Sequence, residues 1–153
     1  KNMMFANRGT SGIDGSTSTA IGNSVQNDSP VLLVTGDLSF FYDVNALWNN
    51  HIPKNFRIII INNSGGGIFK ILPGFKENNL FSEFIETQHN LSARLIAKMF
   101  NFNYTQVSTK FGLNLYLRTF FKNSKKPKIL EIKTSSIKST KILKDYFRYL
   151  SKP

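Results

Sequence analysis

The feature that most constrains the fold is a run of β-branched residues in the middle of the chain. Arg57–Ile61 contains four consecutive isoleucines, and such a run is typical of a strand that is buried on both faces. Val31–Thr35 is a second continuous apolar run, and helix-like stretches separate such runs along the sequence. Because strands that alternate with helices usually pair in parallel, this order predicts an α/β fold whose parallel sheet has helices on both faces.

Five segments are predicted as strands, so the sheet is expected to have at least five: Met3–Ala6, Val31–Thr35, Arg57–Ile61, Tyr104–Val107 and Lys128–Ile132. The predicted helices are Gly15–Val25, Asp43–Asn50, Leu91–Phe100, a helix capped by Thr109, and Lys138–Leu150. The length of 153 residues suits one domain, residues 1–153, with no internal linker.

Two details of the packing can be predicted from the helical spacing. The last helix is amphipathic, and the residues expected to face inward are Ile142, Leu143, Phe147 and Leu150. Trp48, on the Asp43–Asn50 helix, is expected in the core. The stretch from Phe75 to Asn90 has no clear periodicity.

The composition excludes several classes of site. The chain has no cysteine, which excludes disulfides, thiolate metal sites and cysteine nucleophiles. Its two histidines leave little basis for a multi-histidine metal site. No apolar run approaches the roughly 18 residues of a membrane span, and the first residues lack the apolar centre of a signal peptide. We therefore expect a cytoplasmic protein without a membrane span.

The net charge of +11 admits two interpretations. More than half of the basic residues follow Lys110, and a basic segment can mark a nucleic-acid-binding surface. Most of these cations are lysine, however, whereas base reading and bidentate phosphate contacts favour arginine. We expect a solvated basic surface and no nucleic-acid partner, and a non-catalytic basic nucleic-acid-binding domain remains the alternative.

Polar residues follow two of the predicted strands at the point where each strand ends. Gly36-Asp37-Leu38-Ser39 comes after Val31–Thr35, and the glycine-rich loop Asn62–Gly67 comes after Arg57–Ile61. Loops at the carboxyl edge of a parallel sheet are where such sheets bind ligands. Carboxylate, carboxamide and carbonyl oxygens suit Mg²⁺ or Ca²⁺ rather than zinc, and the helix that follows Asp37 would point amides at an anion bridged to the metal. The residues alone thus predict a Mg²⁺–phosphate site, and the alternative is a helix cap beside an ordinary turn.

The same two strand ends resemble a known motif. Gly36-Asp37, with Asn62-Asn63 at the next strand end, is similar to the diphosphate motif of thiamine diphosphate enzymes, although that family usually has glycine where this chain has Leu38. Four stretches resemble one branch, the 2-succinyl-5-enolpyruvyl-6-hydroxy-3-cyclohexene-1-carboxylate (SEPHCHC) synthases of menaquinone biosynthesis: NRGTSGIDGS (7–16), GDLSFFYDVNAL (36–47), NNSGGGIFKILPG (62–74) and ETQHNLSARLIAKMF (86–100). In the last stretch Gln88 stands where a proline is common.

The resemblance covers essentially the whole chain and is strongest in its first hundred residues. It implies the thiamine diphosphate-binding fold of the diphosphate-binding type, and that the chain matches only the C-terminal third of such an enzyme. It implies thiamine diphosphate and Mg²⁺, or Mn²⁺, as cofactors. The implied metal ligands are Asp37, the side chain of Asn63 and the main-chain carbonyl of Gly65.

The resemblance also assigns residues to cofactor and substrates. Gly36, Leu38 and Ser39 would line the diphosphate, and Ile13 would hold the cofactor in its bent conformation. The residues expected at the substrate are Arg8, for a carboxylate, and the apolar wall Ile68, Phe69 and Leu72. For four of these, packing or surface pairing is the alternative: Ile13 in the core, Phe69 and Leu72 on a helix face, and Arg8 paired with Asp14 or Asp43.

The activity implied by the resemblance is that of a transferase. Such an enzyme decarboxylates 2-oxoglutarate and adds the resulting succinyl-semialdehyde carbanion equivalent to isochorismate. The full-length enzyme is expected to be a homo-oligomer, either a dimer or a tetramer. No catalytic residue is expected in this chain, because the activating glutamate of the family belongs to its N-terminal domain, and the chain alone is expected to be inactive. Another thiamine diphosphate-dependent 2-oxo acid decarboxylase, or an acetolactate-type synthase, is the alternative activity.

Overall fold

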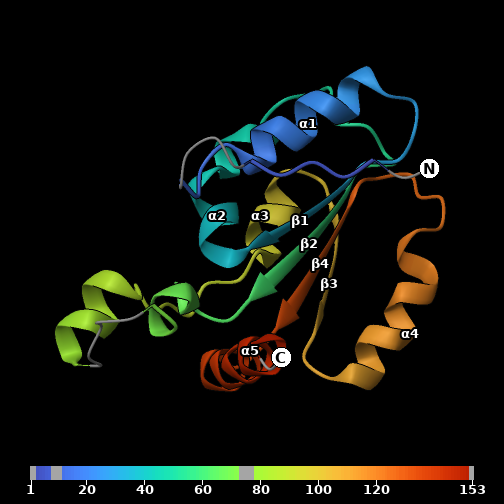
Figure 1. Ribbon diagram of the computed structural model, residues 1–153. Helices are drawn as coiled ribbons and strands as arrows, with labels where there is room; N and C mark the ends of the chain where they lie inside the picture. The colour runs from blue at the N-terminus through green and yellow to red at the C-terminus, as the bar shows by residue number, and fades with distance from the viewer. Residues whose placement is uncertain (1–2, 8–11, 73–77, 152–153) are drawn as a thin grey trace.

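The computed structural model describes residues 3–7, 12–72 and 78–151 (Figure 1). Its centre is a parallel sheet of four strands in the order β1-β2-β4-β3. The strands are β1 (Leu32–Gly36), β2 (Arg57–Asn62), β3 (Asn103–Val107) and β4 (Lys128–Lys133). Each corresponds to a predicted strand within one residue at either end. The α/β class and the parallel pairing predicted from the sequence are confirmed.

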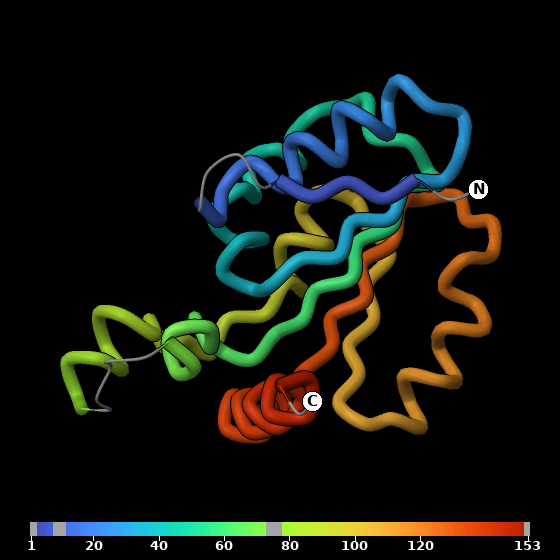
Figure 2. The backbone as a smooth tube through the Cα atoms, viewed as in Figure 1, coloured from blue at the N-terminus to red at the C-terminus, as the bar shows by residue number. Residues whose placement is uncertain are grey.

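Helices cover both faces of the sheet (Figure 1). On one face lie α1 (Ser16–Gln26), α2 (Asp37–Tyr42), the 3₁₀ turn η1 (Val44–Leu47) and α3 (Arg94–Met99). On the other lies α4 (Lys110–Phe120), whose Thr109 cap accepts a hydrogen bond from the Gly112 N–H at 3.1 Å, as predicted. The helix α5 (Ser136–Leu150) follows β4 directly and lies across the carboxyl edge of the sheet (Figure 2). Two short turns, η2 (Gly67–Lys70) and the π-helical η3 (Phe81–Ile85), complete the fold.

The main core lies between the sheet and the α1–α3 layer. Ile58 and Ile60 of β2 and Ile129 of β4 are fully buried and pack with Phe40 and Phe56. Because side chains of a strand alternate between the faces, Arg57 points to the opposite face. There it is buried, and its guanidinium donates to the carbonyls of Phe120 and Lys122 near the end of α4. Burial lowers the pKa of Arg57.

The prediction of at least five strands is wrong for the described residues, since Met3–Ala6 forms no strand. Met3, Met4 and Phe5 are more than three-quarters exposed, so this segment has no packed face. The side chain of Asn7 donates to the Gly15 carbonyl and to Thr19 at 3.3 Å each, which ties the segment to α1 rather than to the sheet.

Several predicted packing details are also wrong. The helix expected over Asp43–Asn50 is divided: α2 begins at Asp37, and only the short turn η1 falls in the expected range. Trp48 is 79% exposed rather than in the core. The predicted α5 is present, but the residues expected to face inward are exposed, namely Ile142, Leu143, Phe147 and Leu150. On β1, Leu32 and Val34 are exposed as well, so one face of that strand is not covered by the described residues.

Candidate functional site

The two polar strand ends meet at one edge of the sheet. β1 and β2 are direct neighbours, with Gly36 opposite Ile61 in the register. The loop after β2 returns toward β1, and the Gly65 N–H donates a hydrogen bond to Oδ2 of Asp37 at 3.1 Å. The convergence expected from the sequence is therefore confirmed for Asp37 and Gly65.

Asp37 is the first residue of α2, and only 2% of it is exposed. Its Oδ1 accepts the N–H of Leu38 at 2.8 Å, while its Oδ2 accepts the N–H of Gly65. A buried carboxylate held by two backbone donors has a defined orientation and retains lone pairs for a further ligand. Leu38 is one of the residues expected to line the diphosphate, and its N–H is the donor to Asp37.

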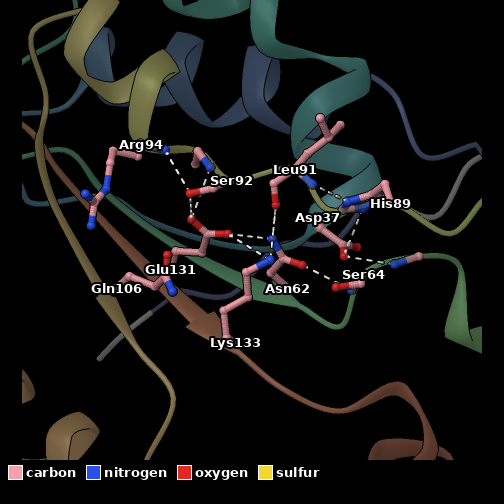
Figure 3. A network of polar contacts seen from close by, with 12 residues as sticks. Asp37, Asn62, Ser64, His89, Leu91, Ser92, Arg94, Gln106, Glu131 and Lys133 are labelled. Carbon is pink, nitrogen blue, oxygen red and sulfur yellow. Dashed lines mark hydrogen bonds and ion pairs between the residues drawn. The ribbon is translucent and has the colours of Figure 1, made fainter.

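His89 lies against the same carboxylate (Figure 3). Its Nε2 is 3.3 Å from Oδ2 of Asp37, and its Nδ1 accepts the N–H of Leu91 at 3.1 Å. Because Nδ1 accepts this bond, a neutral ring carries its proton on Nε2, which lies near Asp37 without a hydrogen-bond partner among the described residues. No motif in the sequence assigns a role to His89. Its proximity to Asp37 depends on the long connection between β2 and α3, which no local pattern predicts.

The glycine-rich loop is shaped by close contacts that leave no room for side chains. Gly65 has φ 149°, and a Cβ there would lie 2.8 Å from the carbonyl oxygen of Glu86. A Cβ at Gly67 would lie 2.5 Å from Nδ2 of Asn63. The side chain of Asn63 therefore lies over Gly67. An open cavity of about 560 Å³ borders this loop, and its lining includes Asn63, Ser64, Lys70, Glu86 and His89.

The other residues proposed for the cofactor lie nearby. Ser39 donates its hydroxyl hydrogen bond to the carbonyl of Ile13, which joins these two residues although they are far apart in the sequence. Ile13 is 43% exposed, so the alternative of a core role for it is wrong. Gly36 is the last residue of β1 and leads directly into Asp37.

The residues proposed for the substrate wall lie on and just after η2. Ile68 and Leu72 are exposed, and Phe69 is half-buried. Ring atoms of Phe69 lie 3.1 Å from where a Cβ of Gly66 would be. Arg8 lies outside the described residues, as does Glu77. Asp43, one of the partners considered for Arg8, accepts two hydrogen bonds from Ser18 and so holds the start of α1.

A buried ionic cluster that the sequence did not predict holds η2 in place. The carboxylate of Glu86, 1% exposed, is 2.7 Å from Nζ of Lys70 and accepts hydrogen bonds from Ser136 and Gln88. Burial alone would raise the pKa of Glu86, but the bonds from Lys70, Gln88 and Ser136 outweigh burial and hold the pKa below its ordinary value. Its carbonyl also accepts the Gly66 N–H at 2.7 Å.

Another buried carboxylate, Glu131, lies in the middle of β4 (Figure 3). It is fully buried and accepts hydrogen bonds from four donors: Asn62 Nδ2, Ser92 Oγ, Ala93 N and Tyr104 OH. The only sequence signal for this network is one acidic residue within an apolar strand. Such a residue shows that a buried partner must exist, but not which one.

The donor set at the strand ends fits a hard divalent cation. Asp37 offers a carboxylate, Asn63 a carboxamide and Gly65 a main-chain carbonyl, and oxygen ligands of these kinds suit Mg²⁺. Within the described part of the chain no group of three or more His, Asp or Glu side chains could hold a metal ion. A cation at this edge would therefore need the Asn63 carboxamide and the Gly65 carbonyl in addition to the Asp37 carboxylate.

Comparison with curated proteins shows close relatives over nearly the whole chain. The chain is 52% identical over 147 residues to the 2-succinyl-5-enolpyruvyl-6-hydroxy-3-cyclohexene-1-carboxylate synthase of Christiangramia forsetii, and the match covers 96% of this chain and 26% of that protein. It is 50% identical over 148 residues to the synthase of the same name from Flavobacterium johnsoniae, covering 97% of this chain and 27% of that protein. The chain thus spans about a quarter of the length of these relatives.

A solved structure has a similar fold. The thiamine diphosphate-dependent 4-hydroxybenzoylformate decarboxylase of Rhodococcus jostii matches with a TM-score of 0.60 at 23% identity, over 76% of this chain and 22% of that one. At this identity the likeness concerns the fold alone. Within the described residues, no helix is both long and apolar enough to cross a membrane.

The family assignment agrees with the fold and with the position of the polar strand ends. The family described as "Thiamine pyrophosphate enzyme, C-terminal TPP binding domain" matches residues 1–132, which is most of the chain. This chain therefore belongs to the family of C-terminal TPP-binding domains of thiamine pyrophosphate enzymes.

Proposed function

We propose that this chain is the diphosphate- and Mg²⁺-binding domain of a SEPHCHC synthase. The observation that carries the proposal is the bond between the Gly65 N–H and the buried carboxylate of Asp37, which brings two predicted ligand residues together at the sheet edge. The relatives at 50 and 52% identity, which bear the name of this synthase, support it. They favour this activity over another 2-oxo acid decarboxylase, an acetolactate-type synthase or a nucleic-acid-binding domain.

In this proposal the strand ends hold the metal and the diphosphate. Asp37, the Asn63 side chain and the Gly65 carbonyl bind Mg²⁺, for which Mn²⁺ can substitute. Gly36, Leu38 and Ser39 line the diphosphate. Ser39 bonds the Ile13 carbonyl, which fixes Ile13 beside these residues. Thiamine diphosphate, when bound, supplies the electron sink for loss of CO₂ from a 2-oxo acid.

The proposed substrates are 2-oxoglutarate and isochorismate, both of which carry carboxylates. Arg8 grips a substrate carboxylate, since a guanidinium can bind it through two parallel hydrogen bonds. Ile68, Phe69 and Leu72 form an apolar wall that keeps water from the reacting atoms. The Glu86–Lys70 ion pair fixes the position of this wall, because Lys70 is the last residue of η2, which also carries Ile68 and Phe69.

The proposal extends to the whole protein. The pathway is menaquinone biosynthesis, the location is the cytoplasm, and the full-length enzyme is a homo-oligomer, either a dimer or a tetramer. The activating glutamate is supplied by another part of that enzyme. Glu86 and Glu131 do not fill this role, because each is buried and its carboxylate is already engaged with several donors.

The proposal can be tested with a chimera in which this chain replaces the matching C-terminal quarter of the C. forsetii synthase. We expect the chimera to release CO₂ from 2-oxoglutarate and to form product with isochorismate. Pyruvate serves as the competing 2-oxo acid. A folded chimera that binds thiamine diphosphate but prefers pyruvate would show that the substrate assignment is wrong.

A further inference from the structure

Glu131 is a buried carboxylate to which the proposed chemistry assigns no role. Its neighbours in β4, Ile129, Leu130 and Ile132, are apolar, and Glu131 itself is 0% exposed. Removing a carboxylate from water costs several kcal/mol, of which its partners return only part. Lys133 Nζ, 3.8 Å from Oε1, offsets part of this cost, and only replacing the carboxylate together with its donors by apolar residues would avoid it. A carboxylate kept at this position therefore indicates a role in orienting a neighbouring side chain.

The two oxygens of Glu131 face different parts of the fold (Figure 3). Oε2 accepts from Ser92 Oγ at 3.0 Å, from the Ala93 N–H at 3.1 Å and from the hydroxyl of Tyr104. Burial and the nearby Glu131 carboxylate raise the pKa of Tyr104 to about 12, so this hydroxyl keeps its proton at neutral pH. Oε1 faces β2, where it accepts from Nδ2 of Asn62.

Asn62 transmits this contact to the loop that follows β2. Its side chain is asymmetric, with an NH₂ donor on one side and a carbonyl acceptor on the other. Glu131 and the Leu91 carbonyl, which is 3.1 Å away, are both acceptors, so Nδ2 must face them. Oδ1 is then directed to the N–H of Ser64, which it accepts at 3.0 Å.

Ser64 lies between two of the proposed metal-binding residues, Asn63 and Gly65. It has φ 66°, an uncommon conformation for a residue with a side chain. Its carbonyl accepts the N–H of His89 at 3.2 Å, and the next N–H, that of Gly65, reaches Asp37. A change in the amide orientation of Asn62 would remove the bond that holds this turn.

We propose that Glu131 is a positioning residue, which sets the amide orientation of Asn62 and thereby holds Ser64 and Gly65 in the conformation that presents the metal-binding oxygens. Only the role assigned to the loop, which is metal binding, rests on the proposed function. The coupling from Glu131 to Ser64 concerns this chain's own residues and can be measured without cofactor.

The test uses amide exchange with water, measured by NMR on the 153-residue chain. Glu131→Gln keeps the shape but places an NH₂ group opposite the NH₂ of Asn62. We expect exchange of the Ser64 amide to rise at least about fivefold relative to Ile60 in β2, as the loss of one hydrogen bond predicts. Ser92→Ala is the matched control, because it removes a donor from Oε2 and leaves Oε1 unchanged.

The exchanged pair Asn62→Asp with Glu131→Gln restores one carboxylate facing one amide. We expect it to recover only part of the Ser64 protection, since the Leu91 carbonyl, although it still accepts from Lys133 Nζ, loses its bond from Asn62 Nδ2. If the single variant does not fold and the double variant does, that rescue also supports the coupling. The proposal is overturned if Ser64 changes only in step with Ile60, if Ser92→Ala has the same effect, or if neither Glu131 variant folds.

A second measurement separates this inference from the proposed function. Mg²⁺ with thiamine diphosphate is added to the wild-type chain, and the amide shifts of Asp37 and Gly65 are followed. If these shifts do not respond, binding by this chain fails while the exchange result still decides the role of Glu131. If they respond, we expect Glu131→Gln to weaken the response more than Ser92→Ala, and an equal effect of both would contradict a positioning role.

Discussion

The backbone N–H of Gly65 donates a 3.1 Å hydrogen bond to Oδ2 of Asp37, and this bond joins the ends of two adjacent parallel strands. It gives Asp37 a fixed orientation at the carboxyl edge of the sheet. It also turns the loop after β2 back over the end of β1. The stability and the ligand binding of the chain are expected to depend on this junction and on the buried groups that support it.

The first prediction concerns the backbone of the loop. Gly65→Ala is expected to lower the free energy of unfolding by roughly 3 kcal/mol, since a side chain at its positive φ is strained and its Cβ would collide with the Glu86 carbonyl. Gly22→Ala is the control, because a Cβ there meets nothing within 4 Å and lies in α1. That change should stabilise by roughly 0.5–1 kcal/mol. Urea unfolding measures both, and equal effects would contradict the prediction.

The second prediction concerns the acid stability of the chain. Because the pKa of Glu86 is lowered in the folded state, its ionised form stabilises the fold above its ordinary pKa of 4.5. This contribution is lost as the pH falls through the lower folded pKa. Glu86→Gln should therefore reduce stability by roughly 3 kcal/mol at neutral pH, since it leaves Lys70 without its buried partner. In Glu86→Gln, the free energy of unfolding should also fall less steeply as the pH drops below about 4.5.

Urea unfolding between about pH 3 and pH 7 tests this linkage. The matched control is Glu83→Gln, because Glu83 is exposed and lies only three residues away. We expect the control to keep the wild-type dependence on pH. Parallel curves for Glu86→Gln and the wild type would show that Glu86 is not the group responsible.

The third prediction is that the chain alone has no synthase activity. The proposed mechanism requires an activating glutamate from another part of the full-length enzyme. The buried Glu86 and Glu131 are held by their own partners and cannot replace it. The purified chain is mixed with Mg²⁺, thiamine diphosphate, 2-oxoglutarate and isochorismate, and CO₂ release is followed. Turnover comparable to that of the C. forsetii enzyme would contradict the prediction.

Much of the fold could be predicted because its signals are local. The run of isoleucines after Arg57 marks a central strand, and polar residues mark where β1 and β2 end. Parallel pairing then places both ends at one edge, and this is why the sequence alone could bring Asp37 and the loop of Gly65 together.

The features that the sequence did not predict depend on contacts between segments that are far apart in the chain. His89 reaches Asp37, and Glu86 reaches Lys70 and Ser136, through a stretch of chain without periodicity. The apolar face of α5 was expected to pack inward because amphipathic helices usually do, yet the helix lies across the sheet edge with Ile142 exposed. Periodicity identifies an apolar face but not the surface that covers it.

In the proposed function, Asp37 and the loop after β2 bind Mg²⁺ together with thiamine diphosphate. The most direct measurement is calorimetric titration of thiamine diphosphate, in the presence of Mg²⁺, into the chimera and its variants. Asp37→Ala should weaken binding by at least roughly 100-fold, since losses of outer-shell groups alone cost about 10–100-fold. Asn63→Ala removes a neutral ligand and should cost less. Asp28→Ala, which removes an exposed carboxylate, should bind like the unchanged chimera. Unchanged affinity in Asp37→Ala would show that Asp37 does not hold the metal and cofactor.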